Sequence, residues 1–118
     1  MMTQSLPHHH GNTEMAIKHL PELNVTEKVA KEFDLLSDPS RLRIMTFLCH
    51  CEECVTDIAT VCEMTAPAVS HHLKLLKDGG LLKTRREGKE MLYSLADSQE
   101  AQIIHTIIDT VFEIKHNE

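Results

Sequence analysis

The stretch Met64–Leu95, MTAPAVSHHLKLLKDGGLLKTRREGKEMLYSL, decides the fold because it predicts one helix followed by a two-stranded hairpin. The ends of this helix are well marked, since Thr65 can cap its N-terminus, Pro67 suits its first turn and Gly79-Gly80 ends it. Three apolar residues recur at helical spacing and predict a single buried stripe: Val69, Leu73 and Leu76.

Two alternating segments follow the glycines, LLKTRR (Leu81–Arg86) and EMLYSL (Glu90–Leu95), and they flank Glu87-Gly88-Lys89. Alternation of apolar and polar residues around a glycine turn predicts a β-hairpin. A helix of this kind, preceded by a short helix and a tight turn, indicates a helix-turn-helix whose second helix enters the major groove of DNA. The hairpin would be a wing.

Positive charge is concentrated in the same stretch. Residues 70–90 carry a net charge of +3, whereas the whole chain carries −6. This pattern indicates a surface for phosphates, although charge alone is equally typical of a solvated helix face and an ordinary charged hairpin. The residues predicted to contact double-stranded DNA are Thr65, Pro67, Ser70, His71, Lys74, Lys77, Arg85, Arg86 and Lys89.

Length and composition restrict the other possibilities. With 118 residues and 42% hydrophobic content, the chain predicts one small domain with a modest core. No apolar run approaches the ~20 residues of a membrane span and no secretory signal is visible, so a cytoplasmic location is expected. The chain shows no Ser/His/Asp set and no Gly-rich phosphate loop, which disfavours an enzyme.

Further helices are expected on both sides of the quoted stretch. Residues 14–20 favour a short helix, and firmer helices are expected from Thr26 to Leu36, over Pro39–Cys49, over Thr56–Val61 and over Gln99–Lys115. Apolar residues expected to pack or share a face in the first three of the firmer helices are Val29, Phe33, Leu36, Leu42, Met45, Leu48, Ile58 and Val61. The isoleucine-rich surface of the last helix is wider than one domain needs, which predicts a homodimer contact.

The chain is therefore expected to have two parts. Residues 1–21 are polar and carry His8-His9-His10, which indicates a mobile arm. Residues 22–118 are expected to form a winged helix-turn-helix domain that ends in a dimerisation helix. The predicted fold class is mainly α with a β-hairpin wing.

Several motifs between Phe33 and Leu95 carry a family resemblance. They are DPSRLRIM (Asp38–Met45), ECVTDIA (Glu53–Ala59), VSHHLKLLKDGGLL (Val69–Leu82), and R-x-G-K with Y-S-L in the wing. Together they resemble the ArsR/SmtB family of metal-sensing winged-helix repressors. The resemblance implies a homodimer that represses metal-efflux or resistance genes and leaves its operator when metal binds.

The resemblance also implies a metal site. In one family arrangement the helix before the recognition helix begins with Cys-x-x-Asp, matched here by Cys54 and Asp57, and the partner's N-terminal arm adds Cys or His ligands, for which His8 and His10, and also His9, are candidates. Residues at i and i+3 are neighbours on a helix, and a thiol at a helix N-terminus is expected to have a lowered pKa. Thr56 stands where the family often has a second Cys, which favours a harder, zinc-like site over purely thiolate coordination. Zn(II) or Cd(II) is the expected sensed ion.

Two alternatives for the metal remain open. Cys49 and Cys51 could join Cys54 in a three-thiolate cluster that suits Cd(II), Pb(II) or As(III). A second family site lies on the final helix, but both family histidines are missing here. The residues that could form a shifted site on that helix are Asp97, His105, Asp109, Glu113 and His116. The alternative is that these residues are only part of a solvated polar face. A repressor of the same fold that responds to arsenite or to oxidation of its thiols is the alternative function.

Overall fold

The computed structural model describes residues 6–8 and 10–115, and it divides the chain into two units that meet between Ala30 and Lys31. The first unit contains α1 (Thr13–His19), which confirms the short helix predicted near residues 14–20. Helix α2 (Leu23–Leu35) begins in the first unit, three residues before the expected Thr26. Thr26 does not start this helix because its hydroxyl donates back to the carbonyl of Glu22, 3.1 Å away, from within the first turn.

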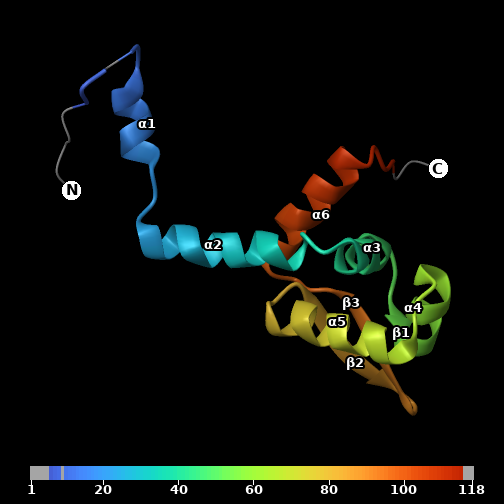
Figure 1. Ribbon diagram of the computed structural model, residues 1–118. Helices are drawn as coiled ribbons and strands as arrows, with labels where there is room; N and C mark the ends of the chain where they lie inside the picture. The colour runs from blue at the N-terminus through green and yellow to red at the C-terminus, as the bar shows by residue number, and fades with distance from the viewer. Residues whose placement is uncertain (1–5, 9, 116–118) are drawn as a thin grey trace. The chain divides into compact units, whose positions relative to one another are not determined.

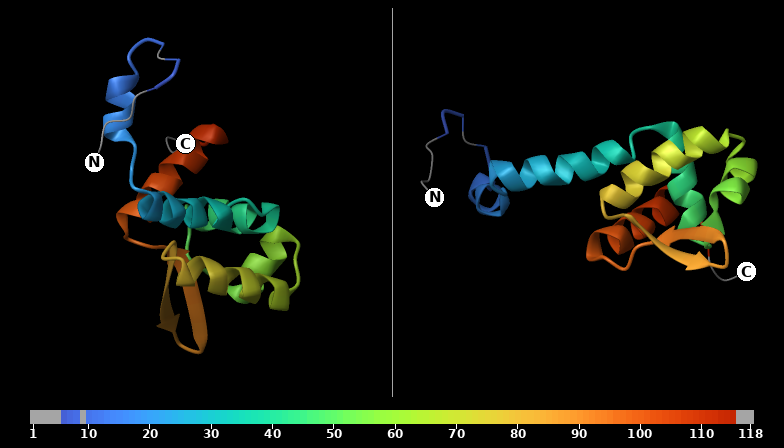
Figure 2. Two further views of the ribbon diagram at one scale, coloured as in Figure 1. Left: turned by 60° about the vertical axis from the view of Figure 1, so that its left-hand side comes forward. Right: turned by 90° about the horizontal axis from the view of Figure 1, so that it is seen from below.

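The second unit holds the remaining elements. These are α3 (Pro39–Leu48), β1 (Glu53–Cys54), α4 (Val55–Cys62), α5 (Ala66–Asp78), β2 (Leu82–Glu87), β3 (Glu90–Leu95) and α6 (Gln99–Val111). Figure 1 shows β2 and β3 as a hairpin beside α5, and the views of Figure 2 show its tip projecting past that helix. The arrangement is a winged helix-turn-helix, as the sequence predicted.

Three helices begin at the caps that local chemistry favours. Asp38 accepts a hydrogen bond from the backbone N–H of Arg41 at 3.0 Å, and Pro39 fills the first turn of α3. Thr65 caps α5 in the same way, accepting from the N–H of Ala68 at 3.3 Å. Ser98 caps α6. The positions of α3 and α5 therefore follow from the sequence.

Helices α4, α5 and α6 end in one motif. In each, a residue with positive φ follows the helix: Glu63 (57°), Gly80 (82°) and Glu113 (55°). After α5, the N–H of Leu81 donates to the carbonyl of Leu76 at 3.0 Å, which is the pairing of a Schellman motif. After α6, the N–H of Ile114 donates likewise to Asp109 at 2.8 Å. The predicted extension of the last helix to Lys115 is therefore wrong, because the chain leaves the helix at Phe112.

The core of the second unit is assembled from α3, α4, α5 and the strand that follows them. Its fully buried large side chains are Ile44, Met45, Leu48, Ile58, Val69, Leu73, Leu76 and Leu81. Leu42 is only half-buried against this cluster. Val61 was expected to pack inward but is 49% exposed, since it lies on the outer side of α4. Val29 and Phe33 of α2 are exposed as well.

The sheet has three antiparallel strands in the order β1-β3-β2. The hairpin pairs Leu82 with Leu95 at its base and Glu87 with Glu90 at its turn, and Gly88 supplies the positive φ of that turn at 62°. Strand β1 was not predicted: Glu53 pairs with Tyr93, and Cys54 pairs with Leu92. The segment that precedes α4 is thereby joined to the wing.

None of the helices in the described ranges has the length and apolar character required to cross a bilayer.

Candidate DNA interface and metal sites

The predicted recognition helix presents its polar face to solvent. Helices α4 and α5 are joined by a tight turn at Glu63 and Met64, and α5 packs its apolar stripe on α3 and α4. All the side chains predicted to contact DNA are exposed: Thr65, Pro67, Ser70, His71, Lys74, Lys77, Arg85, Arg86 and Lys89. The buried and exposed sides of α5 thus separate as a DNA-reading helix requires.

Two of these cations already have carboxylate partners. The ammonium group of Lys74 lies 2.9 Å from Asp78 in the next turn of α5. The guanidinium of Arg85 donates from Nε and Nη2 to Glu52, at distances of 2.7–2.9 Å, and also contacts Glu87 at 2.9 Å. Such a two-pronged pair fixes the guanidinium in orientation. Arg85 therefore has to release the Glu52 carboxylate before its guanidinium can contact a phosphate.

The predicted pair Cys54 and Asp57 does come together, and Glu53 joins it. One ligand atom from each of the three residues lies within 4.8 Å of the other two. Cys54 is the N-cap of α4 and is 7% exposed, while Asp57 lies in the first turn of α4 and Glu53 in β1. One thiol and two carboxylates form a donor set for a divalent cation with affinity for both sulfur and oxygen.

The electrostatics of this centre differ from the sequence-based expectation. The backbone N–H of Asp57 favours the thiolate of Cys54, as a helix N-terminus should, but the Glu90 carboxylate, burial and the charge of Asp57 together raise its pKa above the usual 9.0. The predicted lowering is therefore wrong. The pKa of Glu53 is raised as well, chiefly by its hydrogen bond and charge interaction with Asp57. Acidic groups are therefore concentrated around the Cys54 thiol.

The other thiols are placed separately. Within the described ranges, no metal-ligating group unites Cys49, Cys51 and Cys54. Burial and the charge of Asp109 raise the pKa of Cys49 to about 12. Cys51 donates to the carbonyl of Phe47 at 3.4 Å, and its pKa is also raised, mainly by burial. All four cysteines are free thiols.

The remaining predicted ligands are distributed over the chain. His8 and His10 are exposed residues of the first unit, and His9 and His116 lie outside the described residues. Asp97 forms an ion pair with Lys83 at 3.0 Å, and Glu113 occupies the turn after α6 instead of a helical face shared with Asp109. Of the final-helix set, His105 and Asp109 are neighbours, with Nε2 and Oδ2 2.9 Å apart.

Sequence reasoning missed four residues near these sites: Glu52, Glu53, Glu90 and His50. Glu52 and Glu53 flank the recognised Cys-x-x-Asp motif, so a count of the carboxylates around it would have signalled the acidic surroundings of the thiol. The proximity of Glu90 to Cys54 depends on the pairing of β1 with β3, which no local pattern indicates. His50 lies 59 residues from its partner Asp109, so its role also depends on tertiary structure.

Comparisons with known proteins add three likenesses. A sequence profile of the bacterial regulatory protein arsR family matches residues 38–84. A transcriptional repressor SmtB homolog from Synechocystis sp. is 38% identical over 91 residues, which cover 77% of this chain and 69% of that protein. A cadmium resistance transcriptional regulatory protein CadC homolog from Staphylococcus aureus is 40% identical over 97 residues, which cover 81% of this chain and 79% of that protein.

A solved structure shares the fold over the whole chain. It is the homodimeric winged helix-turn-helix DNA-binding domain of Mb0332 from Mycobacterium bovis, described as a possible ArsR-family transcriptional regulator. The two chains align with a TM-score of 0.66 at 26% identity, covering 100% of this chain and 97% of the other.

Proposed function

The chain belongs to the ArsR/SmtB family of transcriptional regulators, and we propose that it is a metal-responsive repressor whose sensing centre is built on Glu53, Cys54 and Asp57. It is a regulator and not an enzyme. In this proposal the apoprotein binds operator DNA in the cytoplasm as a homodimer, and binding of Zn(II) or Cd(II) releases it, so that metal efflux or resistance genes are expressed.

The single observation that carries the proposal is the convergence of Cys54 with two carboxylates at the start of α4, within 4.8 Å of one another. The raised pKa values of Cys54 and Glu53 are consistent with it, because a bound cation would favour the charged forms that the neighbouring carboxylates disfavour. The arm histidines His8 and His10 are proposed to complete the coordination, and the relatives named for SmtB and for cadmium resistance are consistent with this metal class.

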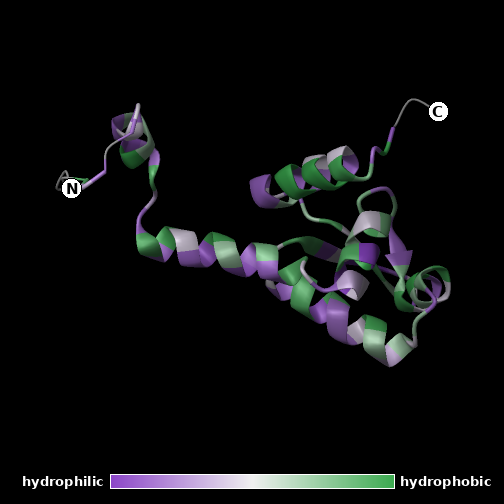
Figure 3. Cartoon of the chain, turned by 45° about the horizontal axis from the view of Figure 1, so that its top comes forward, coloured by the Kyte–Doolittle hydropathy of each residue, from purple (hydrophilic) through white to green (hydrophobic). Residues whose placement is uncertain are grey.

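The dimer is proposed from apolar surface on the second unit. Exposed apolar residues of α6 and the end of α2 adjoin a groove whose lining is almost wholly apolar, and Figure 3 shows hydrophobic residues along α6. Surface of this kind on a small protein marks an interface, and a second copy would give the two recognition helices that two half-sites require. The residues are Phe33, Ile103, Ile107, Val111 and Phe112.

Two contacts would couple the sensing centre to DNA. Strand β1 carries Glu53 and Cys54 and pairs directly with wing strand β3. Helix α4, which carries Asp57, packs on recognition helix α5. A ligand shifts a conformational equilibrium only if it binds one state more tightly, so the centre must prefer an arrangement of wing and recognition helix that fits DNA poorly.

Titration of the reduced full-length protein with zinc and with cadmium tests this proposal. Thiolate-to-metal absorption and release from DNA upstream of the protein's own gene are measured in the same sample. We expect Cys54→Ser to lower metal affinity by about 100-fold or more and to abolish release, since even outer-shell partners of a ligand contribute 10- to 100-fold. Cys62→Ser is the matched control, because Cys62 is 5% exposed and so slightly more buried than Cys54, which is 7% exposed.

Each outcome of this titration is decisive. Release by metal in the wild type and in Cys62→Ser, but not in Cys54→Ser, supports the centre. Unchanged release in Cys54→Ser overturns it. Replacement of His8 and His10 by Ala, with His19→Ala as the control, tests the arm: unchanged metal affinity would remove these histidines from the ligand set.

The thiol-based alternative is less well supported by the same geometry. Redox-sensing cysteines are accessible and have low pKa values, whereas here the pKa values of Cys49, Cys51, Cys54 and Cys62 are all raised. If DNA is released by oxidant in the absence of metal, and Cys54→Ser suppresses this release, the alternative replaces the proposal.

A further inference from the structure

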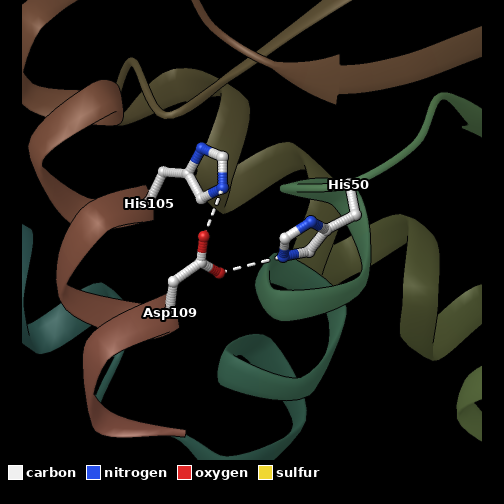
Figure 4. A group of neighbouring side chains, drawn as sticks. All are labelled: His50, His105 and Asp109. Carbon is white, nitrogen blue, oxygen red and sulfur yellow. Dashed lines mark hydrogen bonds and ion pairs between the residues drawn. The ribbon is translucent and has the colours of Figure 1, made fainter. Parts of the chain in front are cut away.

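Three side chains outside the Cys54 centre meet where the end of α3 approaches α6. His105 and Asp109 lie one turn apart on α6, and His50 follows the last residues of α3. Nε2 of His50 is 2.9 Å from Oδ1 of Asp109, and Nε2 of His105 is 2.9 Å from Oδ2. Figure 4 shows both imidazole rings directed at the one carboxylate. One ligand atom from each residue lies within 4.8 Å of the other two.

The cluster is sheltered but reachable from solvent. The side chains of His50, His105 and Asp109 are 29%, 23% and 15% exposed. The two imidazole rings stand perpendicular to each other, with their centroids 5.1 Å apart. The Nε2 atoms therefore approach the two oxygen atoms of the carboxylate from different directions.

We propose that His50, His105 and Asp109 form a second metal site, for a divalent first-row transition ion of the Zn(II), Co(II) or Ni(II) class. Imidazole nitrogen suits these ions, and two imidazoles with one carboxylate leave positions for water. Because these three ligands include no thiolate, they form a harder ligand set, in the hard–soft sense, than the Cys54 centre. Ca(II) and Mg(II) are disfavoured because they require mainly oxygen ligands.

The distances suit such an ion. Ligand atoms about 2.05 Å from a metal are about 2.9 Å apart when they subtend a right angle, and about 3.3 Å apart at the tetrahedral angle. The two nitrogen-to-oxygen separations are both 2.9 Å. The two nitrogens contact different oxygens of Asp109, and the three ligand atoms lie within 4.8 Å of one another, so coordination of one ion requires the rings and the carboxylate to rotate until they converge on it.

This site differs from the family's final-helix site and from the sensing centre. All three ligands come from one protomer, and His50 lies in the turn that follows α3, not on α6. Asp97, which matches the family's final-helix pattern, is paired with Lys83. A bound ion would join α3 to α6 within the protomer. The site does not depend on the sensing role proposed for Cys54.

The competing explanation is that the cluster is held together without a metal, by the hydrogen bond between His50 and Asp109 and the ion-pair contact between His105 and Asp109. The test uses full-length protein that carries Cys54→Ser and Gln in place of His8, His9 and His10, so that the thiol of the Cys54 centre and the histidines of the arm are removed. Zinc and cobalt binding are measured by competition with a chelator, and histidine ring resonances are followed by NMR. We expect one ion per protomer, with shifts at His50 and His105.

Two further substitutions in this background locate the ion. His105→Gln and Asp109→Asn should each lower affinity by about 100-fold or more, and His19→Gln is the matched control that should leave it unchanged. Asp109→Asn retains a hydrogen-bonding side chain of the same shape, and circular dichroism verifies folding. In the wild-type protein, zinc should shift the ring resonances of His50 and His105 in NMR spectra. This measurement tests the site without any substitution. Failure to bind an ion, or binding that His105→Gln and Asp109→Asn leave intact, overturns the proposal; neither result bears on the Cys54 centre.

Discussion

Glu63 has a backbone conformation that glycine takes at the end of the next helix. Its φ of 57° ends α4, and Gly80, with φ of 82°, ends α5 through the same pair of backbone hydrogen bonds. An L-residue in the left-handed region has a steric cost of about 1–2 kcal/mol, which glycine avoids. The turn between helices α4 and α5 is therefore held in place by its surroundings, against the preference of its own residue.

Substitutions at these two turns should act in opposite directions. Glu63→Gly should stabilise the fold by up to about 1 kcal/mol, because relief of strain exceeds the added chain entropy of glycine. Gly80→Ala should destabilise it by about 1 kcal/mol. Urea unfolding followed by circular dichroism measures both. A loss of stability in Glu63→Gly would show that the pairing of Glu63 with Arg43, at 3.9 Å, outweighs the strain.

The proton on Cys54 should make metal binding depend on pH. The pKa of this thiol lies above 9.0, so at neutral pH an ion must displace a proton to bind. Affinity should therefore rise by about tenfold per pH unit between about pH 6 and pH 8, for each proton released. Zinc competition with a chelator of known pH dependence measures this slope. A flat profile would mean that Cys54 is already a thiolate at neutral pH, and that the neighbouring carboxylates do not raise its pKa.

At the scale of elements, β1 places the proposed sensing centre on the sheet. It contains only Glu53 and Cys54, yet it pairs with Tyr93 and Leu92 and so carries the centre to the middle of wing strand β3. Glu52, the residue before it, holds Arg85 of β2 by contacts of 2.7–2.9 Å. A displacement of this segment reaches the wing by both routes, through the backbone and through the ion pair.

Removal of the carboxylate at position 52 should strengthen binding to DNA. Glu52→Gln frees the guanidinium of Arg85 for a phosphate, and we expect affinity for nonspecific duplex DNA to rise a few-fold, since exposed ion pairs are weak. Glu100→Gln is the control, because it changes the net charge equally at an exposed position in the first turn of α6. Fluorescence anisotropy at fixed salt compares them. Equal gains in both variants would assign the effect to net charge alone.

At the scale of the whole molecule, the exposed apolar face of α6 should decide whether the protein can read an operator. Ile107→Glu places a carboxylate in the proposed dimer contact, and we expect it to weaken dimerisation by about 10- to 100-fold or more, because burial of an unpaired charge costs several kcal/mol. Thr106→Glu, on the polar side of α6, is the control. Sedimentation velocity measures the association state. A dimer that survives Ile107→Glu would place the contact elsewhere.

Sequence patterns anticipated the elements that depend on local chemistry. Helices α3 and α5 begin at Asp38 and Thr65 because those side chains cap them, and the hairpin turns at Gly88. The sequence did not reveal β1, whose two residues form a strand only through pairing with β3, nor the end of α6, where Glu113 adopts a conformation usually taken by glycine.

For the candidate sites, too, the sequence anticipated what depends on a local motif and missed what depends on tertiary contacts. Cys54 and Asp57 belong to one local motif and were found, whereas His50 meets Asp109 only because α3 packs on α6. The expected lowering of the Cys54 pKa failed for the same reason: Glu90 acts on the thiol across the sheet. Interactions between distant segments are the part that a single sequence does not disclose.

The ion pair of Glu52 with Arg85 means that each wing carries its own counterion. A phosphate contact made by an unpaired cation releases bound salt from DNA and adds about 0.9 to the slope of log affinity against log salt concentration. When Arg85 turns to a phosphate, Glu52 remains attached to the protein nearby and repels that phosphate. A count of the exposed cations on the recognition helix and wing would therefore overstate the salt sensitivity of the complex by nearly one phosphate for every wing that touches DNA.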